Sequence, residues 1–231
     1  MNEAFSQSFT MKGVLYLMDG KTYRAVRKSS KNTAWEAVSV SGTAYVPTTT
    51  ISAAPTGGGT SYEAVNLLTP KRINTFIGDG TATQFKVDAT DLDETAVTAE
   101  VNGSAVTVSA VNRSTGLVTL AAAPANGNGL ANVSIAFAKT VSGYADKINK
   151  CRFAGLYGGK NDTRVFLSGN PDEPDCDWQS GLYDPTYFPD TGYTRMVRMH
   201  LRSSAISNST KVRSWSSPAA HRRRPVICAP T

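Results

Sequence analysis

The stretch VTAEVNGSAVTVSAV, residues 97–111, decides the class of fold. Apolar and polar residues alternate from Val97 to Val101, which is the pattern of a strand with one buried face. Asn102-Gly103 follows directly, and these residue types tolerate the positive φ angles that both central positions of a type I′ turn require. Ala105–Val111 is the expected return strand. The stretch therefore predicts an antiparallel hairpin.

The same pattern recurs on both sides of this hairpin at intervals of about ten residues. Strand candidates at Thr83–Val87, Gly116–Leu120 and Val133–Phe137 are separated by segments rich in Gly, Asn and Pro. Several short strands at regular spacing, with turns between them, are typical of a β-sandwich. We predict that residues 72–139 form a small antiparallel β-sandwich.

The segments before and after this unit have a similar pattern of short strands and turns. We predict one all-β, antiparallel body from residues 1–71 and 140–193, with the sandwich inserted into it. Such an insertion is tolerated where the ends of the inserted unit lie close together. The strand candidates of the body are Val14–Leu17, Thr22–Val26, Trp35–Val40, Cys151–Tyr157 and Arg164–Ser168.

Residues 47–61 contain two prolines, three consecutive glycines and no periodicity, which predicts a loop. Glycine-rich loops can also cradle a phosphate. However, no Lys-Ser/Thr pair follows Gly57-Gly58-Gly59, and no strand leads directly into a helix there. The segment therefore fits neither the P-loop nor the dinucleotide-binding template, and we expect a surface loop.

The charge of the chain changes abruptly after Asp190. No Asp or Glu follows that residue, whereas Thr191–Thr231 contain eight Lys and Arg residues. Subtracting these eight from the 24 basic residues leaves 16 against 18 acidic residues in positions 1–190, a net charge of −2, although the whole chain carries +6. The basic character therefore belongs to the C-terminal segment, and we expect residues 194–231 to form a disordered basic tail.

Two interpretations of this tail stay open. Arg222, Arg223 and Arg224 are candidate contacts to nucleic acid, because clustered arginines neutralise phosphates in a weak, non-specific and salt-sensitive way. Alternatively, the tail is a solvated basic terminus without a partner, since cationic tails are common.

The sequence contains no motif of a known catalytic class. GxSxG, HExxH and paired Cys/His spacings are absent, and His200 and His221 both lie in the basic tail. Carboxylates alone can support glycoside hydrolysis, but nothing in the sequence pairs them. The acidic groups match no calcium template. We therefore expect no enzyme, no metal and no other cofactor.

Membrane association is not expected either, because no apolar run approaches the roughly 20 residues that span a bilayer. The three cysteines are widely spaced and odd in number, which excludes a disulfide framework and indicates synthesis in a reducing cytoplasm.

An acidic segment that ends near residue 193 carries four prolines and several aromatic residues. The prolines exclude a regular helix, and the aromatic side chains give the segment enough apolar area to pack as an ordered flap. The sandwich, or a flap of this kind at residues 178–193, can also recognise a host-surface carbohydrate, which gives the alternative function of a binding module. The candidate binding surface consists of Trp178, Tyr183, Tyr187 and Phe188.

Three stretches resemble structural proteins of tailed bacteriophages. SFTMKGVLYLMDG, residues 8–20, is similar to the strand pairs of the propeller-like β-sheet blades in those proteins. NDTRVFLSGNP, residues 161–171, together with DPTYF, residues 184–188, is similar to a later blade. Residues 72–139 resemble the small β-sandwich modules that are inserted in phage tail and fibre proteins.

The resemblance implies a propeller-like body and a structural role in the virion, in the tail or the head–tail connector. It implies assembly with other tail proteins and with copies of the same chain, and it implies no catalytic residues. Members of that family run several blades longer, and the similarity stops near Tyr193, where the charge also changes. One hypothesis is that the tail is read in a shifted frame. It fails if the neighbouring frame encodes no acidic, β-patterned sequence.

Overall fold

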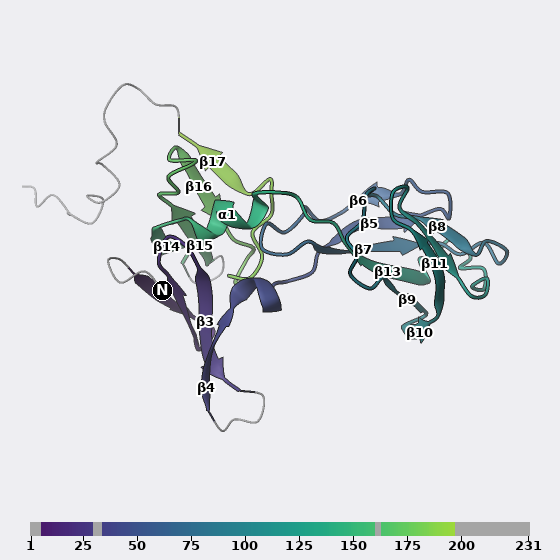
Figure 1. Cartoon of the computed structure of the whole chain (residues 1–231), viewed down its shortest axis with the longest axis horizontal. Coiled ribbons are helices and arrows are strands. Elements are labelled where there is room, and N and C mark those ends of the chain that lie inside the picture. Colours follow the sequence, from purple (N-terminus) through teal and green to yellow (C-terminus); the bar gives the residue numbers. More distant parts are fainter. Residues whose placement is uncertain (1–5, 30–33, 160–162, 197–231) are drawn as a thin grey trace, which may run out of the picture. The chain divides into compact units, whose positions relative to one another are not determined.

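The computed structural model describes residues 6–29, 34–159 and 163–196. Within these ranges the regular secondary structure is almost entirely β-strand, arranged in four sheets (Figure 1). They also contain one α-helix, α1 (Tyr144–Asn149), and one short 3-10 helix (Val40–Thr43). The predicted all-β class is confirmed.

The first sheet is a four-stranded antiparallel meander whose tight turns explain its order. Lys12 and Gly13 both have positive φ, at 50° and 75°, as a type I′ turn requires. At the next turn, the Asp19 carboxylate accepts hydrogen bonds from the backbone N–H groups of Lys21 and Thr22. In chain and spatial order the strands are β1 (Gln7–Met11), β2 (Val14–Met18), β3 (Tyr23–Lys28) and β4 (Trp35–Ser39).

The last sheet follows the same plan. Its strands again lie in chain order and pair antiparallel: β14 (Phe153–Tyr157), β15 (Arg164–Ser168), β16 (Cys176–Gln179) and β17 (Tyr193–Arg195). Four-stranded sheets are also the units of propeller blades. The described residues form no closed propeller or barrel, so the propeller-like form of the body stays a prediction.

These two sheets share one hydrophobic core, and together with the segments packed on that core we call them the body. The core contains Tyr16 and Tyr23 from the first sheet and Leu167 and Trp178 from the last. It also contains Leu67 and Leu68, from the segment before β7 (Lys71–Phe76). Residues from distant parts of the chain therefore bury each other in a single cluster.

One glutamine links the two sheets of the body at their edges. The Gln7 side-chain amide donates to the Ala154 carbonyl at 3.2 Å and accepts from the Ala154 N–H at 2.7 Å. The side chain thus replaces the two backbone hydrogen bonds that a neighbouring strand would supply. As a result, β14 is covered at this point by β1.

The hairpin at residues 97–111 forms as predicted at its turn but not along the whole return strand. Asn102 and Gly103 have φ angles of 51° and 77°, and β9 (Thr98–Val101) pairs with β10 (Ser104–Val106). The chain then changes sheet, because β11 (Val108–Asn112) pairs with β12 (Leu117–Leu120). One predicted strand is therefore divided between two sheets.

These two sheets form the sandwich, with six strands in one and three in the other. The smaller sheet has the order β11-β12-β8 (Gln84–Lys86). The larger has the order β10-β9-β13-β7-β5-β6, where β13 is Val133–Ala138, β5 is Thr48–Ala53 and β6 is Thr60–Ser61.

The larger sheet therefore includes strands that precede the predicted boundary at residue 72. The prediction of a loop over residues 47–61 was wrong for β5 and β6. β5 pairs in parallel with β7, with two irregularities in register, and its burial does not alternate from residue to residue. A strand without period-two alternation gives no strand signal in the sequence.

The three glycines between β5 and β6 have a structural explanation. Gly57, Gly58 and Gly59 all have positive φ, a conformation that glycine adopts without the steric cost of a Cβ atom. At Gly59 a Cβ atom would also lie 2.7 Å from the Ile51 carbonyl oxygen, which is closer than real contacts allow. The three glycines therefore allow the chain to turn back tightly into β6.

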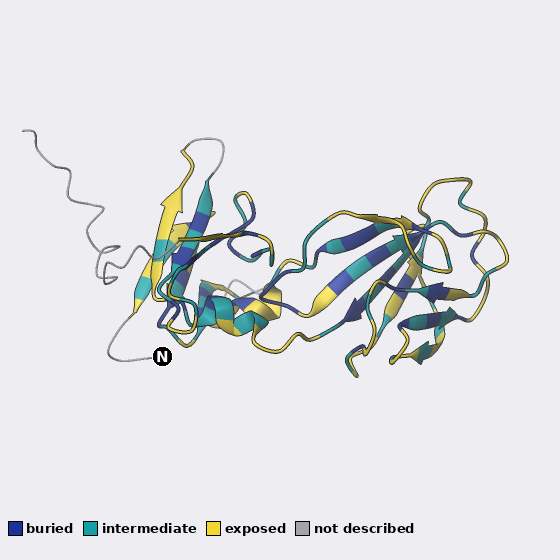
Figure 2. Ribbon diagram, turned by 90° about the horizontal axis from the view of Figure 1, so that it is seen from above, coloured by how far each residue is buried: buried dark blue, intermediate teal, exposed yellow. Residues whose placement is uncertain are grey.

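The core of the sandwich is separate from that of the body. Figure 2 shows buried residues recurring along its strands, and the cluster includes Phe76, Phe85, Val118 and Ile135. The rings of Phe76 and Phe85 meet edge to face at 5.4 Å between centroids. Each unit thus buries its own set of apolar side chains.

Candidate functional site

The four predicted binding residues do not form one surface. Trp178 is 1% exposed and Phe188 is fully buried, and both belong to the body core. Tyr183 and Tyr187 are half-buried. The prediction was wrong for Trp178 and Phe188, because the apolar area that suggested a binding flap is used to anchor this segment to the core.

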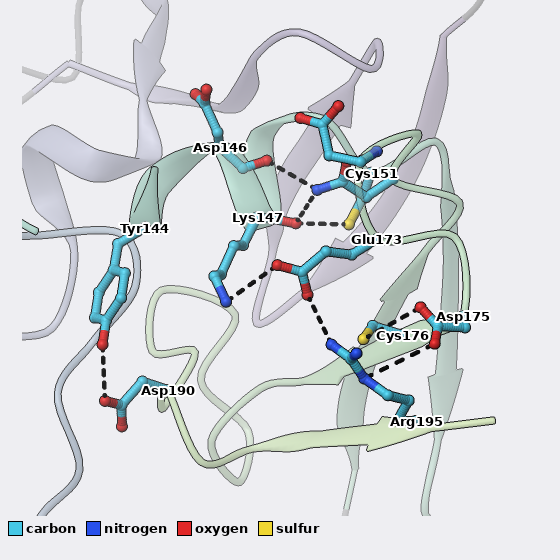
Figure 3. A network of polar contacts seen from close by, with 11 residues as sticks. Tyr144, Asp146, Lys147, Cys151, Glu173, Asp175, Cys176, Asp190 and Arg195 are labelled. Atoms are coloured by element: carbon cyan, nitrogen blue, oxygen red, sulfur yellow. Dashed lines mark hydrogen bonds and ion pairs between the residues drawn. The ribbon is translucent and has the colours of Figure 1, made fainter. Parts of the chain in front are cut away.

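A network of charged side chains holds this segment in place (Figure 3). The Lys147 ammonium lies 4.9 Å from the centre of the Trp178 ring and 3.1 Å from a carboxylate oxygen of Glu173. Arg195 on β17 lies 3.6 Å from the other Glu173 oxygen and 3.8 Å from Asp175. The network connects α1, the segment before β16, and β17.

Three acidic residues of this segment, Asp172, Glu173 and Asp175, are therefore engaged in ion pairs. Asp172 pairs with Lys150 at 2.8 Å, in addition to the pairs of Glu173 and Asp175. No group of three or more His, Cys, Asp or Glu side chains in the described ranges has the arrangement of a metal site.

Two cysteines next to this network are buried and not bonded to each other. Burial raises the pKa of the Cys151 thiol to about 12, and burial also raises the pKa of Cys176. Because the thiolate is the reactive form, the fold gives neither residue the character of a nucleophile.

Asn66 is the polar centre of the body. Its side-chain nitrogen donates to the carbonyls of Tyr45 and Thr186, both at 2.8 Å. Its side-chain oxygen accepts from the N–H groups of Leu68 and Phe188, at 3.1 and 3.0 Å. One buried amide thus joins three separate segments through four hydrogen bonds.

The segments that Asn66 joins carry an accessible cluster of two tyrosines and a glutamate, Tyr45, Glu63 and Tyr187, which we call the tyrosine–glutamate surface. The Tyr45 hydroxyl donates to both Glu63 oxygens, at 2.8 and 3.1 Å, and the Thr48 N–H donates to one of them at 2.6 Å. The rings of Tyr45 and Tyr187 lie 5.1 Å apart at 53°. Tyr45 is 40% exposed.

Both tyrosines of this surface resist ionisation. Burial, followed by the hydrogen bond to Glu63, raises the pKa of Tyr45 to about 12. Burial, followed by the negative charge of Glu63, raises the pKa of Tyr187 to about 12. The folded state therefore favours the neutral phenols beyond the ordinary pKa of 10.0.

This effect predicts a loss of stability in alkaline solution. A group whose pKa is higher in the folded state contributes stability that is present below pH 10 and lost as the pH rises toward 12. We expect the urea midpoint to fall over this range, and to fall less steeply in a Tyr45→Phe/Tyr187→Phe variant. Tyr62→Phe, at a residue that is 66% exposed, is the control. Equal slopes for the double variant and the natural chain would contradict the prediction.

A second candidate feature is the outer edge of β4. Within the described residues β4 pairs only with β3, over five residue pairs without a shift in register. Trp35 at its start is 67% exposed. The edge strands β6 and β10 of the sandwich are only two and three residues long, and β11 has a register irregularity. Short and irregular edges resist pairing with other chains, whereas β4 lacks these protections.

The described region ends within the predicted basic tail, at residue 196. Thr194 and Arg195, placed in the tail from the sequence, belong to β17. Arg222, Arg223 and Arg224 lie outside the described residues.

In the described ranges there is no helix with the length and apolar character needed to cross a bilayer.

Comparisons with known proteins give no assignment: no family model matches the chain, and neither a curated protein nor a solved structure matches it. Of these residues only Tyr187 was predicted from the sequence to lie on a binding surface, whereas Asn66, Tyr45 and Glu63 were not placed with it. Tyr45, Glu63 and Tyr187 are distant in the chain and no short motif contains them.

Proposed function

We propose that this chain is an architectural protein that assembles with neighbouring subunits through the open edge of β4. The observation that carries the proposal is a regular five-residue edge strand with a tryptophan that is 67% exposed. An edge strand presents unpaired N–H and C=O groups, to which another strand can add.

The sequence resemblance narrows this role to the tail or head–tail connector of a tailed-bacteriophage virion. Partners would be other virion proteins and further copies of the chain. This narrower proposal rests on residues 8–20, 161–171 and 184–188, and on the module-like stretch 72–139. The proposed role needs no catalytic residue and no cofactor.

Solution mass tests the assembly. We expect light scattering coupled to size-exclusion chromatography to give multiples of the 24.6 kDa chain that increase with concentration. Trp35→Lys should weaken association by about tenfold or more, since tryptophans in interfaces often contribute at least about 2 kcal/mol and lysine blocks edge pairing.

Leu130→Lys is the matched control, because Leu130 is another large apolar residue, 75% exposed, in a loop of the sandwich. It should leave the mass unchanged. A monomer at all concentrations, or an equal effect of both substitutions, would refute assembly through β4.

The alternative function, carbohydrate binding, is not supported on its original surface. Two of its four side chains, Trp178 and Phe188, are buried in the core and cannot stack against a sugar ring without unfolding the body. Carbohydrate binding is therefore kept only as an outcome in the test of the tyrosine–glutamate surface.

A further inference from the structure

We propose that the tyrosine–glutamate surface is a docking site for an arginine side chain of a neighbouring protein. This docking site would be a second contact in the proposed assembly, and its role in the cell rests on that proposed function. The surface is separate from the edge of β4, so the two contacts can be tested independently.

The carboxylate of Glu63 is oriented but not neutralised. The Tyr45 hydroxyl and the Thr48 N–H fix its position, yet a carboxylate has about four lone-pair positions and can still accept from a bound group. Among the described residues no Lys or Arg forms an ion pair with it. Glu36, Glu94 and Glu173 each pair with a cation of the chain, whereas Glu63, like Glu100, has no such pair among the described residues.

The two tyrosine rings supply the second half of an arginine site. The two rings lie 5.1 Å apart at an angle of 53°, the Tyr45 hydroxyl binds the carboxylate, and aromatic faces attract cations. The guanidinium group is planar, so it can stack on a ring while its N–H groups bond to a carboxylate. Since the Tyr45 hydroxyl donates to Glu63, its oxygen lone pairs also remain able to accept.

Charge favours an arginine over a neutral sugar at this surface. Asp184 contributes to the raised pKa of Tyr45, and Asp190 contributes to that of Tyr187, so two further carboxylates lie close to the rings. Their field attracts a cation, whereas a neutral saccharide gains little from it. The same field disfavours the phosphates of nucleic acid.

The test compares two blocked tripeptides, acetyl-Gly-Arg-Gly-amide and the same peptide with citrulline, which has the shape of arginine but no charge. Ligand-observed saturation-transfer NMR at low salt measures both affinities on the full chain, even if it is assembled. We expect the arginine peptide to bind about five- to tenfold more tightly. Equal affinities for the two peptides would overturn the proposal.

Variants locate the binding. Glu63→Gln should weaken binding of the arginine peptide by about five- to tenfold, to the level of the citrulline peptide. Tyr45→Ala should weaken it as well, whereas Tyr45→Phe, which keeps the ring, should retain most of the affinity. Glu36→Gln, at a glutamate that pairs with Arg27 on the first sheet, and Tyr157→Ala, at a tyrosine that is 77% exposed, are the controls. Equal losses in the control variants would also overturn the proposal.

Two further readouts separate the outcomes. Retention on a glycan array that Glu63→Gln abolishes, without preference for arginine over citrulline, would assign the surface to carbohydrate and refute the arginine site. The solution mass of the same samples separates this proposal from edge assembly. An assembled chain without arginine preference refutes only the docking site, and a monomer with arginine preference refutes only the assembly through β4.

Discussion

Replacing Asn66 by alanine is expected to unfold the body or bring it close to unfolding. The substitution removes four hydrogen bonds. It leaves the Tyr45 carbonyl and the N–H groups of Leu68 and Phe188 without a partner, while the Thr186 carbonyl still accepts from the Tyr45 N–H. Each buried group left unsatisfied costs about 1–3 kcal/mol, and we expect a total loss of about 3–5 kcal/mol after partial relaxation. This is a large part of the roughly 5–15 kcal/mol that stabilises a typical domain.

Urea unfolding followed by tryptophan fluorescence measures this loss selectively. The sandwich strands contain no tryptophan, whereas Trp178 lies in the body core. Asn149→Ala is the matched control, because this half-buried asparagine in α1 makes no side-chain hydrogen bond with the described residues, and we expect a change within about 0.5 kcal/mol. Asn66→Ala with a stability equal to that of Asn149→Ala would show that the four bonds do not hold the body together.

Trp178→Ala is expected to have an effect of similar size for a different reason. The indole is 1% exposed, and it contacts the Tyr193 ring at 5.1 Å between centroids and the Lys147 ammonium. Truncating a buried tryptophan to alanine costs about 3–5 kcal/mol, because transfer free energy is lost and a cavity remains. The position of β17 should also loosen, since Tyr193 packs on this ring.

Trp178→Phe separates packing from polarity. The indole nitrogen is buried and has no hydrogen-bond partner in the described structure, so phenylalanine removes volume without breaking a hydrogen bond. We expect a smaller loss, of about 1–2 kcal/mol. Circular dichroism during urea unfolding gives both values without relying on Trp178 fluorescence. If the Trp178→Ala chain were as stable as the natural one, Trp178 would not anchor the core and would again be a candidate surface residue.

Local features of the chain could be predicted from the sequence because they depend on neighbouring residues. The turn at Asn102-Gly103 and the turn at Asp19-Gly20 are fixed by residue types that favour these conformations. By contrast, β5 was missed, since its place in the sheet depends on parallel pairing with β7, and no hairpin turn connects parallel strands. The predicted strand at residues 105–111 is divided between two sheets, and this division likewise depends on tertiary pairing with β9 and β12.

The candidate site was less predictable than the fold. The burial of Phe188 depends on contacts such as the edge-to-face packing on Tyr23, 165 positions earlier in the printed sequence. Glu63 and Tyr187 meet Tyr45 because Asn66 and backbone hydrogen bonds join their segments. An aromatic residue in an acidic, proline-rich segment therefore indicates anchoring as readily as binding, and the sequence pattern contains nothing that separates the two.

The most direct test of the assembly is hydrogen–deuterium exchange at β4, measured by mass spectrometry over a range of protein concentrations. Assembly through this edge predicts that the backbone amides of residues 35–39 exchange more slowly as the mass increases, while the loop around Leu130 does not change. Trp35→Lys should abolish this protection. An increase in mass without protection of β4 would place the interface elsewhere, and a constant monomer with unchanged exchange would contradict the assembly itself.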